Sequence, residues 1–192
     1  MRHEFGRKAF HLLSLIYLAA YTLIGWPAVL PWMLAWTAVV AVLETWRLRS
    51  PRLNEALTGF FGGLARPEEK DKYSGVIHTT LGVLAVMALF GREPRLVAAG
   101  IYCAAFGDAA AALFGKAFGR HKIRTGKSIE GSLACFVVCL LVGWSNGFSS
   151  YSTILAAAAA SLVEILPTTR WLNDNLWMPI VMAGVLALCR GS

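Results

Sequence analysis

Acidic and basic residues of the kind that handle phosphate gather near the middle of the chain. Asp108 lies inside an apolar run. The loop that follows carries five cations: Lys116, Arg120, Lys122, Arg124 and Lys127. Next to Lys127, Gly126 and Ser128 lead into another apolar run. Because a helix amino terminus presents free N–H groups and partial positive charge, this pattern predicts a site where a cationic loop and a carboxylate together bind phosphate and its Mg²⁺.

The start of that second run also has a purely structural interpretation. Ser128 is a favoured N-cap residue, and Glu130 in the first helical turn would complement the helix dipole. Neither role needs a ligand. Helix capping and phosphate binding therefore both remain open for these two residues.

Small residues recur at four-residue spacing beside Asp108. Gly107, Ala111 and Gly115 would share one ridge of a helix, and such a ridge lets a second helix approach closely. Packing explains the small residues, but it does not explain an ionisable group inside an apolar run, where an unpaired carboxylate is costly. We therefore treat Asp108 as a candidate functional residue.

The composition predicts that lipid is the solvent for much of the chain. Of the 192 residues, 57% are hydrophobic and 15% are charged, and the mean hydropathy is +0.57. Seven apolar runs have lengths near that of a membrane-spanning helix: Ala9–Gly25, Ala28–Trp46, Gly75–Phe90, Leu96–Phe114, Ile129–Gly147, Ile154–Leu166 with its flanks, and Leu176–Cys189. We expect an all-α, polytopic helix bundle of about seven transmembrane helices. Residues 1–192 would form one transmembrane catalytic domain, with its chemistry at helix ends and short loops.

Charge placement predicts the orientation of this bundle. Of the 18 Lys and Arg residues, all but Arg92, Arg95 and Arg190 fall on one face of the predicted topology. By the positive-inside rule, the amino terminus is cytoplasmic and the carboxyl terminus lies outside, in a plasma or inner membrane. The acidic residues are equally one-sided, since only Glu93 falls in an outer loop.

The stretch Pro51–Tyr73 predicts an amphipathic helix on the inner membrane surface. Its apolar residues recur at near-helical spacing, with Arg52, Glu55 and Arg66 around them. The segment would either cover the site as a lid or only connect two spans. Both roles remain open.

Two polar sets inside the apolar runs have structural explanations. The cysteines lack metal-ligand or disulfide spacing, so we expect small buried hydrophobes at Cys103, Cys135, Cys139 and Cys189. The patch His78-Thr79-Thr80 would be satisfied by a hydrogen bond between helices.

Further motifs follow one another through the chain. They are Glu4, Arg7, Lys8 and His11; Glu44 and Arg47; Arg66, Pro67, Glu68 and Glu69; Gly107 and Asp108 with Gly115 and Gly119; Lys127 to Ser132; Glu164; and Asp174 with Asn175. In this order they resemble the polyprenol kinase family, which includes dolichol kinase, phytol kinase and CTP-dependent diacylglycerol kinase. The family is distantly related to phosphatidate cytidylyltransferases.

The resemblance implies roles for these residues. Members transfer the γ-phosphate of a nucleotide, usually CTP, to a long-chain alcohol with a divalent metal such as Mg²⁺. The implied catalytic residues are Asp108, Lys127 and Glu130. The implied nucleotide or phosphate contacts are Lys122, Arg124, Gly126, Ser128, Gly131, Ser132, Arg7, Lys8 and His11. For Arg7, Lys8 and His11, the alternative is that they only anchor the first helix at the lipid headgroups. The implied metal ligands are Asp108, Glu164 and Asp174, and the supporting residues are Glu44, Arg47, Arg66, Glu69 and Asn175. For Asp174 and Asn175, an equal alternative is a cap on the last helix.

The expected function is a lipid-alcohol kinase that uses CTP or another nucleoside triphosphate at the cytoplasmic face. The expected acceptor is an isoprenoid alcohol of the polyprenol, phytol or geranylgeraniol type. One alternative is a CDP-lipid-forming enzyme similar to phosphatidate cytidylyltransferase, and another is a non-enzymatic, transporter-like bundle. We expect membrane lipids but no nucleic acid as partners, and a homo-oligomer is left open.

Overall fold

The computed structural model describes residues 12–61, 71–123, 126–167, 169 and 173–189, and every regular element among them is helical. In chain order the elements are η1 (Leu12–Ser14), α2 (Leu15–Ile24), α3 (Val29–Arg49), α4 (Pro51–Phe61), α5 (Gly75–Phe90), α6 (Pro94–Tyr102), η3 (Cys103–Gly107), α7 (Asp108–Phe118), α8 (Ile129–Ser145), α9 (Ser150–Ile165) and α10 (Asp174–Leu188). The predicted all-α fold class is confirmed.

Every predicted apolar run contains a helix. Two helical segments, Val29–Arg49 and the continuous Pro94–Phe118, are long and apolar enough to cross a membrane by length and composition. The other apolar helices are shorter, and many large apolar side chains point outward, such as Leu23 (85% exposed) and Trp32 (68% exposed). An apolar exterior of this kind suits a lipid surrounding.

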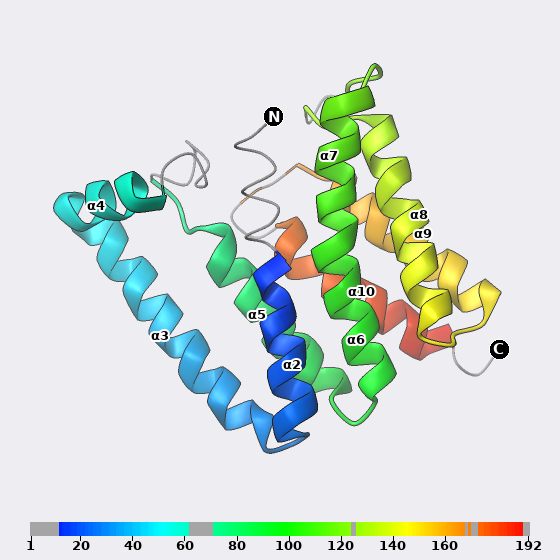
Figure 1. Cartoon of the computed structure of the whole chain (residues 1–192), viewed down its shortest axis with the longest axis horizontal. Helices are drawn as coiled ribbons and strands as arrows, with labels where there is room; N and C mark the ends of the chain where they lie inside the picture. The colour runs from blue at the N-terminus through cyan, green and yellow to red at the C-terminus, as the bar shows by residue number, and fades with distance from the viewer. Residues whose placement is uncertain (1–11, 62–70, 124–125, 168, 170–172, 190–192) are drawn as a thin grey trace.

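The bundle is centred on α10. This helix packs against α9, α5 and α6, while α8 packs against α7 and α9. Its side chains Met178, Met182 and Leu186 are fully buried in the core. In Figure 1, α3 leans away from the bundle at one side, and α4 turns off its end.

A close contact joins α7 to α8, as the small-residue ridge predicts. A Cβ atom added to Gly131 would lie 2.5 Å from the carbonyl oxygen of Ala111 and 3.1 Å from the Cα of Gly115. A Cβ added to Gly107 would approach the sulfurs of Cys139 and Cys135. The ridge therefore sets the spacing between the helix that begins with Asp108 and the helix that follows Lys127.

The structural explanations for the polar sets inside the apolar runs are confirmed in part. Thr80 makes a hydrogen bond between helices, whereas His78 and Thr79 contact carbonyls of their own helix. Three of the four cysteines are buried, and Cys189 is only half-buried. The Thr80 hydroxyl lies 3.0 Å from the Tyr17 hydroxyl, which also accepts from Trp36 Nε1 at 3.1 Å, so one hydrogen-bonded chain joins α5, α2 and α3. All four cysteines are free thiols, and Cys103, Cys135 and Cys139 are fully buried.

The predicted surface segment begins as expected but is described as a helix only over Pro51–Phe61. Arg52 and Glu55 are exposed on α4. The position of α4 relative to a membrane surface remains a prediction.

The helix contact generates a stability prediction. Gly131→Ala should lower the free energy of unfolding by roughly 1–3 kcal/mol, because its methyl group would press on the Ala111 backbone. Thermal unfolding of the detergent-solubilised protein measures the change.

Gly59→Ala on α4 is the matched control, because an added Cβ at Gly59 meets nothing within 4 Å. It should leave the protein unchanged or stabilise it by up to about 1 kcal/mol. Equal effects from the two substitutions would show that the α7–α8 spacing does not depend on Gly131.

Candidate active site at the start of helix α8

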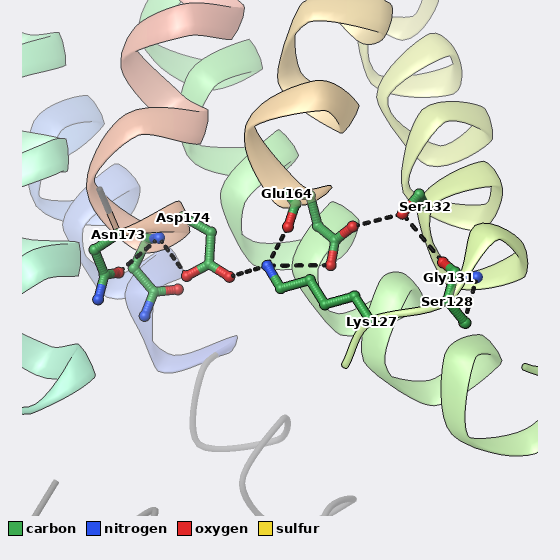
Figure 2. Close-up of polar contacts among 8 residues, drawn as sticks. Lys127, Ser128, Gly131, Ser132, Glu164, Asn173 and Asp174 are labelled. Carbon is green, nitrogen blue, oxygen red and sulfur yellow. Dashed lines mark hydrogen bonds and ion pairs between the residues drawn. The ribbon is translucent and has the colours of Figure 1, made fainter. Parts of the chain in front are cut away.

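The ammonium group of Lys127 lies at the centre of a polar cluster formed by three segments. Its Nζ donates to Asp174 Oδ2 at 3.0 Å, and it lies 3.4 Å from Glu164 Oε1. It also donates to the backbone carbonyl of Glu164. Figure 2 shows the lysine reaching between the last turn of α9 and the first turn of α10. Residues far apart in the sequence thus surround one cation.

The carboxylates of this cluster are deeper than the lysine. The side chains of Asp174 and Glu164 are 4% and 7% exposed, whereas that of Lys127 is 21% exposed. Burial by itself lowers the pKa of Lys127, but the charges of Asp174, Glu164 and Asp108 outweigh it, so the net pKa lies above that of a free lysine. Lys127 therefore stays positively charged through the physiological pH range.

Asp108 is buried within electrostatic range of this cluster. It is the first residue of α7 and is 6% exposed, and its charge makes the smallest of the contributions that raise the pKa of Lys127. The five residues before it, η3, form a π-helical turn that joins α6 to α7. Such insertions occur often at functional sites, and the sequence analysis did not foresee this one. The turn changes the direction in which the following residues face, and Asp108 is the first of them.

A tight turn fixes the backbone of Lys127. The N–H of Ile123 donates to the Lys127 carbonyl at 2.8 Å, and the N–H of Gly126 donates to the Ile123 carbonyl at 2.9 Å. Gly126 has a φ of 81°, a left-handed value that favours glycine. Lys122 and Ser128 pair across the turn as an isolated antiparallel bridge. These contacts fix the backbone of Lys127 and of the residues on either side of it, so its side chain starts from a defined position.

Ser128 and Ser132 make structural contacts at the start of α8. The Ser128 hydroxyl caps the helix by accepting from the Gly131 N–H at 3.1 Å, so the capping interpretation is confirmed. Ser132 donates to Glu164 Oε2 at 2.8 Å and thereby holds the carboxylate whose other oxygen faces Lys127. We infer that Ser132 orients Glu164.

Glu130 faces away from this cluster. Its carboxylate lies 2.7 Å from His121 Nδ1 and also accepts from the His121 backbone N–H at 3.2 Å. The His121 side chain is 74% exposed, so this pair lies at the surface of the loop. Lys122 is likewise exposed. The predicted roles of Glu130 in catalysis and of Lys122 in phosphate binding stay predictions, since the structure does not bring either residue to Lys127.

The proposed cap on the last helix is displaced by one residue. Asn173 is the N-cap of α10, and its side chain accepts from the Asn175 N–H at 3.0 Å. Neither Asp174 nor Asn175 is therefore the N-cap, although Asp174 Oδ1 also accepts from the Asn175 N–H at 3.0 Å. The other oxygen of Asp174, Oδ2, accepts from Lys127, and Asn175 is buried.

Glu44 and Arg47 form a separate polar cluster near the carboxyl end of α3. Arg47 is 6% exposed and pairs with Glu44 at 3.0 Å. It also donates to Asn54 Oδ1 at 2.8 Å and to the Lys72 carbonyl at 2.7 Å, while Glu44 accepts from the Ser74 N–H. These contacts connect α3, α4 and the start of α5, which fits the supporting role predicted for Glu44 and Arg47.

Several predicted site residues lie outside the described part of the chain. These are Arg7, Lys8, His11, Arg66, Glu69 and Arg124. Their predicted roles stay predictions.

The cluster fits a hard cation in its chemistry but supplies few ligands. Glu164 and Asp174 already hold a positive charge through oxygen atoms, the donor type that Mg²⁺ prefers. Within the described ranges, no group of three or more His, Cys, Asp or Glu residues is arranged to hold a metal alone. Mg²⁺ commonly binds one or two carboxylates and completes its shell with water and substrate phosphates. The residues therefore fit a Mg²⁺ ion that binds two carboxylates and completes its shell with water or with substrate phosphates.

Comparison with known proteins decides the family. The chain is 31% identical to CTP-dependent diacylglycerol kinase 1 of Saccharomyces cerevisiae, over 94% of this chain and 71% of that protein. It is 27% identical to the protein of that name in Schizosaccharomyces pombe, over 97% of this chain and 94% of the relative. A dolichol kinase of the same yeast is 33% identical over 43% of this chain and 18% of its own length. The chain belongs to the polyprenol kinase family of lipid kinases.

The other comparisons add no further assignment. No family model matches the chain, and no solved structure matches it. Membership in a lipid kinase family and the apolar helices together support the predicted membrane protein. None of the three kinases above is named as a cytidylyltransferase or a transporter.

The Ser132 contact generates a second stability prediction. Ser132→Ala should cost roughly 1–3 kcal/mol, because it removes a hydrogen bond to the buried Glu164 carboxylate. Ser145→Ala removes a hydroxyl that bonds only within its own helix, and it should change stability by less than about 0.5 kcal/mol. Chemical denaturation of both variants in one detergent compares them, and equal stabilities would contradict the inferred role of Ser132.

Proposed function

We propose that this polyprenol kinase family member is a CTP-dependent lipid kinase, and that its first candidate substrate is diacylglycerol. The observation that carries the proposal is the convergence of Lys127, Glu164, Asp174 and Asp108 in a chain whose relatives over almost its whole length are CTP-dependent diacylglycerol kinases. In the proposed reaction, the oxygen of the lipid alcohol forms a bond to the γ-phosphorus of CTP. The bond from that phosphorus to the β–γ bridging oxygen breaks, and CDP leaves.

The described residues suit the separate parts of this reaction. We assign the proton of the alcohol to Asp108, because it is a buried carboxylate within electrostatic range of Lys127. Lys127 would supply a permanent positive charge for the phosphates, and the N–H groups at the start of α8 would add partial positive charge. Glu164 and Asp174 would hold Mg²⁺, which would supply further charge neutralisation together with the substrate phosphates.

We further propose that the seven apolar helical segments all cross the membrane, with the cluster at the cytoplasmic face. Lys127 precedes α8, Glu164 lies in the last turn of α9, and Asp174 begins α10, so these three positions belong to one end of the bundle. The positive-inside rule favours the cytoplasmic side for this end, because the basic loops accompany it. A site there would meet nucleotide from water and alcohol from lipid.

An isoprenoid alcohol remains the second candidate substrate. It was the expectation from the sequence, and the match to a dolichol kinase favours it over part of the chain. The kinases that match over 94% and 97% of the chain are named for diacylglycerol instead, and we therefore place diacylglycerol first.

A substrate panel tests the proposed activity. Purified protein with Mg²⁺ and γ-labelled CTP should transfer label to diacylglycerol and release CDP, whereas a cytidylyltransferase would release pyrophosphate. Phytol, geranylgeraniol, undecaprenol and dolichol complete the panel, and ATP replaces CTP in a parallel series. Label transfer only to an isoprenoid alcohol would overturn the choice of substrate, and no transfer to any alcohol would overturn the kinase.

Substitutions test the assigned residues. Asp108→Asn and Lys127→Ala should each lower kcat/KM about 100-fold or more, because each removes a charge from the reacting centre. Lys72→Ala is the control, because it removes an exposed lysine outside the cluster, and it should change kcat/KM less than about threefold. Glu130→Gln tests whether Glu130 is catalytic. Full activity in that variant would show that Glu130 has only its structural contact with His121 in the loop. Retained turnover in both Asp108→Asn and Lys127→Ala would contradict the site.

A further inference from the structure

The contacts of Lys127 conflict with its proposed task. An ammonium group has three N–H donors, and three oxygen atoms surround this one: the Glu164 carbonyl, Glu164 Oε1 and Asp174 Oδ2. Two of the donors are used in hydrogen bonds, to the Glu164 carbonyl and to Asp174 Oδ2, and Glu164 Oε1 lies 3.4 Å away as an ion-pair partner. Lys127 must therefore give up at least part of this arrangement before its donors can turn to the phosphates of a nucleotide.

The same oxygens are those proposed to hold the metal. A Mg²⁺ ion would need to approach the carboxylates of Glu164 and Asp174 to about 2.1 Å, which is the region that the ammonium now fills. Two like charges at such short separation repel strongly inside a protein. The lysine and the metal ion therefore compete for one pair of carboxylates.

The exposed fractions of the three side chains show which of them a metal ion from solvent meets first. Lys127 is 21% exposed, while Glu164 and Asp174 are 7% and 4% exposed, so the lysine covers the carboxylates on the solvent side. Its backbone is held by the hydrogen bonds with Ile123 and by the pairing of Ser128 with Lys122. Because the backbone stays in place, the ammonium group of Lys127 can leave the carboxylates only by rotation about the four side-chain bonds of the lysine.

We propose that Lys127 is the counter-ion of Glu164 and Asp174 in the nucleotide-free protein. A divalent cation then takes its place between the carboxylates and displaces the ammonium group toward the phosphates. The exchange keeps two buried carboxylates neutralised at every stage, which avoids the cost of an uncompensated buried charge. It also makes phosphate binding by the lysine depend on metal binding. This inference rests on the proposed function, because the metal ion is that of the nucleotide complex.

Metal binding without nucleotide or lipid tests the exchange. Lys127→Met removes the ammonium and retains a side chain of similar length. In EDTA the variant should unfold at a lower temperature than the wild type, and Mg²⁺ alone should restore its stability. From the metal dependence of the unfolding temperature, the variant should bind Mg²⁺ at least about tenfold more tightly than the wild type.

Two further variants make the result specific. Lys116→Met removes an exposed lysine and should leave the response to Mg²⁺ as in the wild type. The double variant Lys127→Met, Asp174→Asn should lose the tighter Mg²⁺ binding of Lys127→Met, because one of the two carboxylates is neutralised. Equal Mg²⁺ affinity in the wild type and in Lys127→Met would overturn the proposal.

A measurement on the wild type does not depend on whether the variant folds. An amine-reactive reagent followed by mass spectrometry reports the accessibility of Lys127, with the exposed Lys72 as the internal reference. Saturating Mg²⁺ should raise labelling of Lys127 relative to Lys72, and unchanged labelling would overturn the exchange. Because neither experiment uses CTP or lipid, a positive result without kinase activity would reject the proposed function and leave the exchange standing.

Discussion

The ion pairs of Lys127 with Glu164 and Asp174 are the interaction on which the polar end of the bundle depends. Two carboxylates that are almost fully buried would each carry a large desolvation cost if they were left alone. One ammonium group satisfies both, and it comes from a loop outside the two helices that carry them. Apolar packing holds α9 against α10, and the ion pairs of Lys127 attach the loop to both helices.

The neighbouring contacts keep this cluster in place. Ser132 holds the second oxygen of Glu164, and Ser132 can do so because α8 lies close to α7 on one side and to α9 on the other. The approach of α7 requires glycine at position 131, where the Ala111 carbonyl leaves no room for a Cβ atom. The close packing of α7 against α8 therefore determines where the charged cluster at the end of the bundle lies.

The cluster has the elements that the proposed phosphoryl transfer requires. Phosphoryl transfer requires positioning and charge stabilisation more than covalent chemistry from the protein. Helix ends could supply both, because Lys127 lies just before α8, and the last turn of α9 and the first turn of α10 contribute the carboxylates.

The sequence alone determined the helical class, the positions of the apolar helices and most residues of the cluster. Apolar runs of this length specify helices because the backbone must satisfy its own hydrogen bonds in an apolar solvent. The spacing of Gly107, Ala111 and Gly115 specified a close helix contact, and Asp108, Lys127, Glu164 and Asp174 stood out because charge inside or beside apolar runs is costly.

Only the tertiary structure decided which of these residues meet. Glu130 and Lys127 are close in sequence, yet Glu130 contacts His121 while Lys127 reaches Glu164 and Asp174. Lys127 lies before the extended N-cap residue Ser128, whereas Glu130 lies in the first turn of α8. The cap of α10 at Asn173 and the π-helical turn before Asp108 also escaped the sequence. Such local choices depend on hydrogen-bond partners from distant segments, and a one-dimensional pattern does not specify those partners.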